Sequence, residues 1–241
     1  FKYIKGLLRG DMGKSIIMNQ SVSKLIFDVF PNTAKLTLFS IFIAWFIGIP
    51  CGIIAALKQD SFIDKIISLF SIVNISIPSF FIGMALQYFI SYKLNLLPIS
   101  GFYSFKHMIL PAFVLSMYLI GQITRLIRAG MINVLSNDYI KTAVSKGQSG
   151  FKIIIFHELK NCILPVITVM LLQVTSLLGG AIITESIFAI PGIGTLSISA
   201  LTNRDMPLLQ GTIILSTSLI IIGNLIADII CAFIDPRIRY E

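Results

Sequence analysis

The sequence has few charged residues for a chain of its length. Asp, Glu, Lys and Arg make up 12% of the 241 residues, whereas apolar residue types make up 56%. Soluble domains carry about 25% charged residues, so this chain lacks the polar groups to cover a water-exposed surface of its size. The composition excludes a soluble enzyme and a disordered chain, and it indicates that lipid surrounds much of the protein.

Cysteine and histidine are also scarce. The three cysteines, Cys51, Cys162 and Cys231, are far apart and lie in or beside apolar runs. They have neither the spacing of a disulfide framework nor that of a metal site, and the two histidines are too few for one. We therefore expect no metal site, and we interpret the cysteines as small apolar packing residues.

Basic residues outnumber acidic ones, 19 to 11, which gives a formal net charge of +8. In an apolar chain this excess fits the basic loops on the cytoplasmic side of a membrane better than a phosphate-binding face. We expect a lipid bilayer and no nucleic acid as partner.

Five apolar runs have the length and composition of membrane spans, for which a helix needs about 20 residues. They are residues 36–57, 66–92, 108–124, 161–184 and 206–227. These runs are too continuous for the strands of a membrane barrel, which alternate over about 10 residues. The sequence therefore predicts an all-α, polytopic bundle of five transmembrane helices.

The basic residues of the connections give the orientation of these spans. Ten of them fall on one side, including six between Arg125 and Lys160, and three fall on the other. The positive-inside rule predicts that the first side is cytoplasmic and that residues 1–35 form an extracytoplasmic leader. The leader itself carries six basic residues, which fits a long external loop that follows a further helix before residue 1.

Several polar side chains lie within or next to the spans. They either line a translocation path or form hydrogen bonds between helices, and the sequence leaves both roles open. The path candidates are Asn74, Ser79, Gln87, Gln122, Gln173, Ser176 and Glu185. The spans contain no series of ionisable residues that would act as a proton relay.

Two motifs of enzyme chemistry are incomplete. Gly13-Lys14-Ser15 ends like a phosphate loop, but position 8 is leucine where that loop needs glycine. His157-Glu158 begins like a zinc-protease helix, but Asn161 stands where the second histidine belongs. We therefore expect that the chain is not an enzyme and binds no cofactor of its own.

The loop of residues 136–161 carries the clearest pattern. Apolar residues at helical spacing predict two short amphipathic helices with Gly147 between them. Such a loop either rests on the membrane surface or docks into a groove of a partner protein, and periodicity alone favours neither.

Residues 139–147 and 157–165 resemble the coupling loop of ABC importer permeases, most closely the branch that handles dipeptides, oligopeptides and nickel. Further segments of that branch follow in order over essentially the whole chain: residues 10–15, 110–112, Arg125, Arg128, 185–194, 203–207 and 235–239. The general pattern of the loop begins Glu-Ala-Ala, whereas this chain has Lys141-Thr142-Ala143, as is typical of the peptide and nickel branch.

The resemblance implies a permease subunit in a bacterial cytoplasmic membrane. Its implied partners are a second, homologous permease, two ABC ATPases that use ATP and Mg²⁺, and an extracytoplasmic solute-binding protein. The residues that would couple this chain to the ATPases are Tyr139, Lys141, Thr142, Ala143, Lys146, Gly147, His157, Asn161, Leu164 and Pro165.

The implied domains are the leader (residues 1–35), a permease domain (36–234) that contains the coupling loop (136–161), and a cytoplasmic tail (235–241). Members of this branch have an additional first helix before the leader, so we expect that the sequence begins after it. The expected cargo is a di- or oligopeptide, with nickel or a metal chelate as the alternative. A rival from another class is a secondary transporter driven by an ion gradient, which would need carboxylates at mid-membrane depth and inverted repeats.

Overall fold

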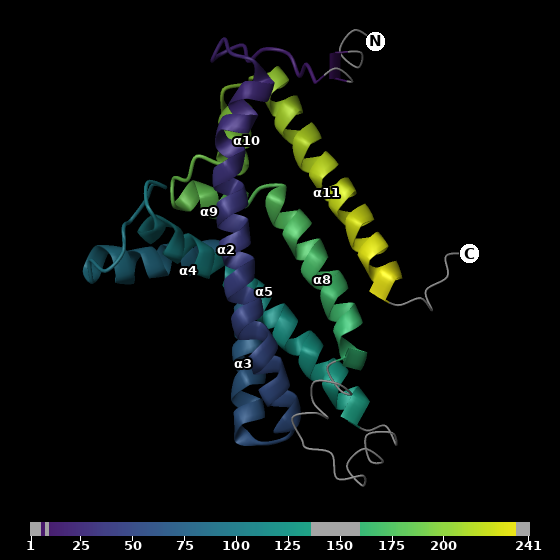
Figure 1. The fold of residues 1–241 in the computed structure, drawn as a ribbon. Coiled ribbons are helices and arrows are strands. Elements are labelled where there is room, and N and C mark those ends of the chain that lie inside the picture. The colour runs from purple at the N-terminus through teal and green to yellow at the C-terminus, as the bar shows by residue number, and fades with distance from the viewer. Residues whose placement is uncertain (1–5, 8–9, 136–159, 235–241) are drawn as a thin grey trace. The chain divides into compact units, whose positions relative to one another are not determined.

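The computed structural model describes residues 6–7, 10–135 and 160–234 (Figure 1). Within these residues the secondary structure is helical, apart from an isolated antiparallel bridge between Lys14 and Ser21. The elements in chain order are α2 (Val22–Leu57), α3 (Phe62–Ser76), α4 (Ser79–Leu86), the π-helical segment η1 (Gln87–Lys93), α5 (Phe105–Leu135), α8 (Lys160–Leu178), α9 (Ile182–Ile187), α10 (Ile193–Thr202) and α11 (Met206–Ile234).

The chain forms two compact units, and the long helices contribute residues to both. Unit 1 comprises Phe1–Ser40, Pro78–Leu115 and Val174–Gly223, and unit 2 comprises Ile41–Ile77, Ser116–Gln173 and Asn224–Glu241.

Three of the described helices are long and apolar enough to cross a membrane: α2, α5 over Phe105–Val134, and α11 over Met206–Phe233. They contain the predicted runs 36–57, 108–124 and 206–227. The run 66–92 is divided between α3 and the α4–η1 segment, and these would count as a fourth span if they cross the membrane together. The run 161–184 is divided between α8 and α9. The all-helical membrane fold is confirmed, whereas five complete spans stay a prediction.

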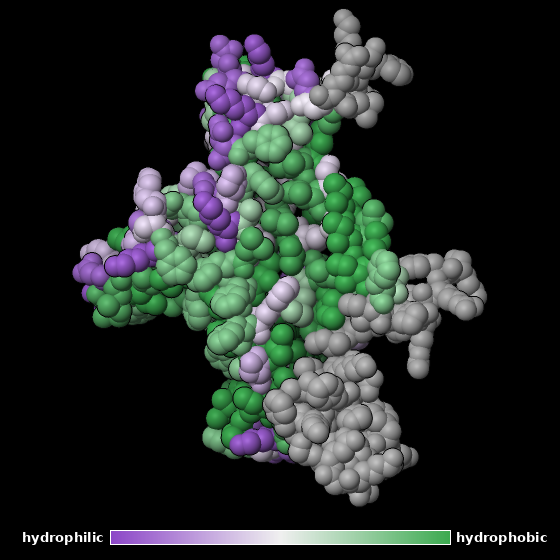
Figure 2. Space-filling view, in the orientation of Figure 1, coloured by the Kyte–Doolittle hydropathy of each residue, from purple (hydrophilic) through white to green (hydrophobic). Residues whose placement is uncertain are grey.

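Hydrophobic side chains cover much of the visible surface (Figure 2). Phe42 and Phe46 of α2 are 62% and 71% exposed, and Ile221 of α11 is 62% exposed. Because water would strongly disfavour so much exposed apolar area, lipid must contact these helices. The chain is a multi-pass membrane protein.

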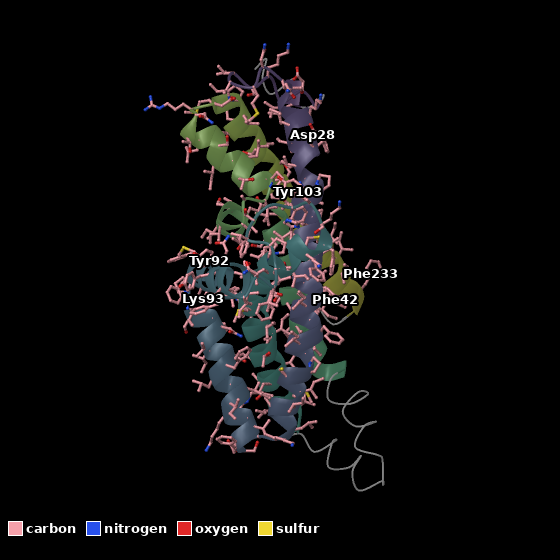
Figure 3. All side chains as sticks on the ribbon, turned by 90° about the vertical axis from the view of Figure 1, so that its left-hand side faces the viewer. Asp28, Phe42, Tyr92, Lys93, Tyr103 and Phe233 are labelled. Atoms are coloured by element: carbon pink, nitrogen blue, oxygen red, sulfur yellow. The ribbon has the colours of Figure 1, made fainter. Side chains whose placement is uncertain are left out.

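Aromatic side chains gather around the end of η1, where Tyr92 and Lys93 are exposed (Figure 3). The Lys93 ammonium lies 5.5 Å from the ring centroid of Tyr88 and 5.9 Å from that of Phe89. Tyrosine and lysine side chains serve as anchors at the membrane interface. The charge distribution of the sequence predicts that this end of the run 66–92 lies at such an interface.

Close approach of backbones holds the helices of unit 2 together. A Cβ atom at Gly121 of α5 would lie 2.7 Å from the Ser71 carbonyl oxygen of α3, and one at Gly52 of α2 would lie 2.8 Å from the Thr124 carbonyl oxygen of α5. The Thr124 hydroxyl donates to the Gly48 carbonyl at 3.2 Å. Small residues and hydroxyl bonds of this kind are typical of helix packing in membranes.

Candidate functional site

Most of the predicted coupling residues lie outside the described residues. They are Tyr139, Lys141, Thr142, Ala143, Lys146, Gly147 and His157. Of the remaining three, Asn161 and Leu164 belong to the beginning of α8, and Pro165 lies inside that helix with an exposed side chain. Contact of these residues with an ATPase stays a prediction.

Two of the seven path candidates are hydrogen-bonded to each other in unit 2. Gln173 Nε2 of α8 donates to Gln122 Oε1 of α5 at 2.9 Å, and Gln122 Nε2 donates to the Tyr118 hydroxyl at 2.8 Å. Gln173 is buried, and its Oε1 atom has no hydrogen-bond partner among the described residues. Leaving a buried acceptor unpaired costs about 1–3 kcal/mol, so this amide has the capacity to bind a further donor.

Gln122 also lines a cleft of about 680 Å³ in unit 2. This volume lies within the range of about 300–1,000 Å³ that is typical of small-molecule pockets. The cleft residues are Ser68, Ile72 and Ile75 of α3, Gln122, Arg125, Leu126, Arg128 and Ala129 of α5, and Val169 of α8. Its walls are thus mainly apolar, with a few polar groups.

The two arginines of the cleft differ in their partners. Arg128 Nε and Nη2 donate to the two carboxylate oxygens of Asp64 at 2.6 and 2.7 Å, and Asp64 is buried. Asp64 also accepts hydrogen bonds from the Ser68 hydroxyl and the Asp60 N–H group. Arg125 is exposed and forms no ion pair within the part of the chain that the structure describes. The positive charge that the cleft offers to a ligand is therefore that of Arg125.

Glu185, another path candidate, lies in unit 1 with no exposed surface. Its Oε1 atom accepts a hydrogen bond from the Thr33 hydroxyl at 2.7 Å, and its Oε2 atom accepts one from the Thr195 N–H group at 3.1 Å. The Thr33 hydroxyl in turn accepts the Ile193 N–H group. Glu185 and Thr33 thus satisfy free N–H groups in the first turn of α10, where negative charge is favoured.

Two glycines make room for this carboxylate. A Cβ atom at Gly192 would lie 2.4 Å from Glu185 Cδ, and one at Gly194 would lie 2.8 Å from Glu185 Oε2. The positions of Gly192 and Gly194 relative to Glu185 therefore have a local physical reason: the carboxylate needs both positions to lack a side chain.

The remaining path candidates are placed separately. Asn74 is buried in unit 2, and its Nδ2 atom has no partner among the residues described. In unit 1, Gln87 Nε2 donates to the Ile99 and Ile187 carbonyls at 2.7 and 3.3 Å. Ser79 is half-buried and Ser176 is exposed. Their role in a translocation path stays a prediction.

Tyr118 and Ser68 were not among the candidates expected from the sequence, and Arg125 was expected only as a basic residue of a connection and as part of the resemblance. Their spacing could have revealed them. Tyr118, Gln122, Arg125 and Ala129 recur at intervals of four, three and four residues, which places them on one face of a helix. On α3, Ser68, Ile72 and Ile75 follow the same rule.

The family model of the binding-protein-dependent transport system inner membrane component matches residues 48–240. The chain is 38% identical over 250 residues to the oligopeptide transport system permease protein AppB of Bacillus subtilis, an alignment that covers 99% of this chain and 79% of that protein. It is also 38% identical over 265 residues to the dipeptide transport system permease protein DppB of Haemophilus influenzae, covering 99% and 80% of the two chains.

A solved structure of the MetNI methionine ABC transporter, in an inward-facing conformation, contains a chain of the same fold. The TM-score is 0.75 at 14% sequence identity, and the alignment covers 88% of this chain and 96% of that chain. At this level of identity the likeness concerns the fold alone. From the family match and the two relatives together, it follows that the chain belongs to the family of binding-protein-dependent transport system inner membrane components, the permease subunits of ABC importers.

Proposed function

We propose that this chain is a permease subunit of an ATP-driven importer of di- or oligopeptides in a bacterial cytoplasmic membrane. The observation that carries the proposal is the cleft of unit 2, which Gln122 and Arg125 line. Gln173 is hydrogen-bonded to Gln122, and its Oε1 atom has no partner among the described residues. The names of AppB and DppB as oligopeptide and dipeptide permeases support the same cargo.

The chemistry of the cleft fits a short peptide. An arginine side chain binds a carboxylate strongly, so Arg125 would receive the C-terminal carboxylate of the cargo. The Gln122 and Gln173 amides would exchange hydrogen bonds with its peptide groups. The walls formed by Ile72, Ile75 and other apolar residues offer no polar group that would select one particular side chain of the cargo. A carrier of varied peptides requires such tolerance.

The transport cycle that we propose needs partners. A second, homologous permease completes the path, two cytoplasmic ABC ATPases hydrolyse ATP with Mg²⁺, and an extracytoplasmic solute-binding protein delivers the cargo. This chain carries no cofactor of its own. Closure of the ATPase dimer would move the coupling loop of residues 136–161, and the permeases would then alternate between outward and inward access.

The test is uptake of labelled dipeptide by the reconstituted importer with its binding protein. Arg125→Gln should lower the uptake of a dipeptide with a free C-terminal carboxylate about tenfold, and it should leave the slower uptake of the C-terminally amidated dipeptide unchanged. Lys58→Gln is the matched control, because it removes one exposed basic charge from the same unit at a residue that does not line the cleft. Equal loss for both peptides would contradict the proposed role of Arg125.

Two further arms address the alternatives. Competition of dipeptide uptake by nickel complexes, and of nickel uptake by dipeptides, decides between peptide and metal cargo. Uptake that survives ATP depletion but stops when the proton gradient is abolished would identify a secondary transporter instead.

A further inference from the structure

Unit 1 contains a groove of about 320 Å³ between α10 and α11, which we call the α10–α11 groove (Figure 1). Its walls are mainly apolar, and Leu201 of α10 and Ile213 of α11 are 62% and 54% exposed. The hydroxyls of the two serines that line it are already used: Ser197 donates to the Ile193 carbonyl at 2.8 Å, and Ser216 donates to the Gly179 carbonyl at 2.7 Å. The groove therefore suits an apolar occupant.

The dimensions of the groove restrict what can fill it. Its lining follows α11 from Leu209 to Ile220, which is about 17 Å at 1.5 Å per residue. Spread over that length, the volume corresponds to a cross-section of about 20 Å², or a strip about 4–5 Å wide. One extended hydrocarbon chain fits such a strip, since carbon atoms pack about 3.5–4 Å apart. A helix of a partner protein, about 10–12 Å across with its side chains, is too wide.

A free positive charge lies at one end of the groove. Arg204 belongs to the turn between α10 and α11, and its N–H group donates to the carbonyl of the groove residue Leu201 at 3.2 Å. The Arg204 side chain is exposed, and it forms no ion pair within the ranges 6–7, 10–135 and 160–234. An arginine has five N–H donors, so this guanidinium can bind an anion.

The neighbouring carboxylate does not occupy Arg204. Asp205 is buried, and it accepts hydrogen bonds from the Ser15 hydroxyl and from the N–H groups of Ile16 and Ile17, the latter two at 3.3 and 3.2 Å. Asp205 thus binds the loop of residues 15–20, whereas Arg204 faces the surroundings of the protein.

The depth of Arg204 in the membrane matches that of a lipid headgroup. The helix that is apolar enough to cross the membrane begins at Met206, two residues after Arg204. Apolar residues cover the adjoining part of α11 (Figure 2). Arginines at the ends of membrane helices lie at the polar interface, where the phosphates of lipids are found. The charge distribution of the connections predicts that this is the extracytoplasmic interface.

We propose that the α10–α11 groove is a binding site for an anionic phospholipid. One acyl chain lies along the groove, and the Arg204 guanidinium donates hydrogen bonds to the phosphate, for which its planar fork is well suited. Lipids with a cationic headgroup bind more weakly, because their own ammonium group competes with Arg204 for the phosphate. This site is separate from the cleft of unit 2, and the inference does not depend on the nature of the cargo.

The experiment uses the complete importer in proteoliposomes of phosphatidylcholine with a small fraction of phosphatidylglycerol that carries a diazirine in one acyl chain. After irradiation, mass spectrometry of the digested chain should find the label on groove residues such as Ile198 and Ile213. Arg204→Gln should lower this labelling about tenfold, because it removes a charge-assisted contact to the phosphate. Lys24→Gln is the matched control: Lys24 is an exposed basic residue of the same unit that does not line the groove, so labelling should not change.

A second variant tests the acyl-chain part of the site without changing its charge. Thr217 is exposed and lines the groove, so Thr217→Trp should block the groove and abolish the labelling, whereas Thr217→Val should preserve it. Dipeptide uptake by the same proteoliposomes checks that both variants assemble.

Competition identifies the source of the phosphate group. Unlabelled phosphatidylglycerol should suppress the labelling, whereas the same amount of added phosphatidylcholine, or inorganic phosphate in the buffer, should not. Displacement by inorganic phosphate would overturn the inference, because it would identify a site for a free anion.

Two further results would overturn it. Label spread over α11 regardless of Arg204 would show ordinary contact with bulk lipid, and label found only on the second permease would show that a protein covers the groove. Neither result bears on the proposed function, which loss of dipeptide uptake in the wild-type importer would contradict.

Discussion

At the residue scale, the buried carboxylate of Glu185 determines which side chains positions 192 and 194 accept. Its two oxygen atoms are occupied by the Thr33 hydroxyl and the Thr195 N–H group. A side chain at Gly192 would occupy the volume of the carboxyl group itself. The hydrogen bonds and the glycines are therefore parts of one arrangement at the beginning of α10.

Replacing Gly192 by alanine should displace this carboxylate from its partners. Breaking hydrogen bonds to a buried charged group is expected to cost about 2–4 kcal/mol of stability, which a lower thermal-unfolding temperature of the purified protein would show. Gly83→Ala is the control within the same unit, since its nearest neighbours lie 3.5 Å or more from the new Cβ atom. The control should be neutral or slightly stabilising because alanine favours a helix, and equal losses in both variants would contradict the explanation.

At the same scale, Asp205 makes the stability of the protein depend on pH. Burial by itself raises the pKa of Asp205, but the hydrogen bonds from the Ser15 hydroxyl and from three backbone N–H groups outweigh it, so the pKa lies below its ordinary range. A lowered pKa in the folded state means that Asp205 stabilises the protein above about pH 4, the ordinary value for aspartate. This contribution is lost as the pH falls below that value.

The wild-type protein should therefore have a higher thermal-unfolding temperature than Asp205→Asn at pH 6, and the difference should shrink towards pH 3. Asp28→Asn is the control, because Asp28 is exposed. A difference between wild type and Asp205→Asn that stays constant over this range would show that the charge of Asp205 does not hold the loop of residues 15–20.

The sequence could not reveal which polar residues meet. Gln122 and Gln173 are 51 residues apart, and a rotation of either helix by one residue would separate them. The same holds for Thr33 and Glu185, which are 152 residues apart. Composition and periodicity identify such residues as candidates, but only the packing of helices assigns their partners.

At the scale of elements, the proline and glycine positions explain where predicted spans are interrupted. The run 66–92 breaks between α3 and α4 at Ile77 and Pro78, where proline supplies no N–H group to continue the helix. The run 161–184 breaks after Leu178, where Gly180 has a φ of 120°. Hydropathy predicted the apolar stretches correctly, because it measures composition; it does not report whether the backbone stays helical through a proline or a glycine pair.

The ion pair between α3 and α5 is a second feature of this scale. Arg128→Met should destabilise the protein by about 3–5 kcal/mol, because it leaves the buried Asp64 carboxylate without a counter-charge. The double variant Asp64→Leu/Arg128→Met should regain much of this loss, since it removes both charges. Thermal unfolding of the purified variants measures the effect, and a double variant less stable than Arg128→Met would contradict it.

At the scale of the whole molecule, the proposed function requires an assembly. Purification of the chain from its native membrane in mild detergent should recover two ATPase copies and one related permease for each copy of this chain. A chain that is recovered alone, although its partners are present in the same membrane, would contradict the assembly.

Within the importer, Gly147→Asp should separate ATP hydrolysis from uptake, because a charged side chain between the two predicted loop helices would disturb their turn. Normal uptake in that variant would exclude a coupling role for this position.

The contact between Ser15 and Asp205 also sets an order of events during synthesis. These residues are 190 positions apart, and a ribosome that adds about 5–20 residues per second needs roughly 10–40 s to cover that distance. Throughout this interval the amide groups of Ile16 and Ile17 lack the acceptor that will hold them. Residues 15–20, which are translated before α11, thus acquire their final form only when the beginning of α11 arrives beside them, so that a finished loop marks a chain whose α11 helix is already in place.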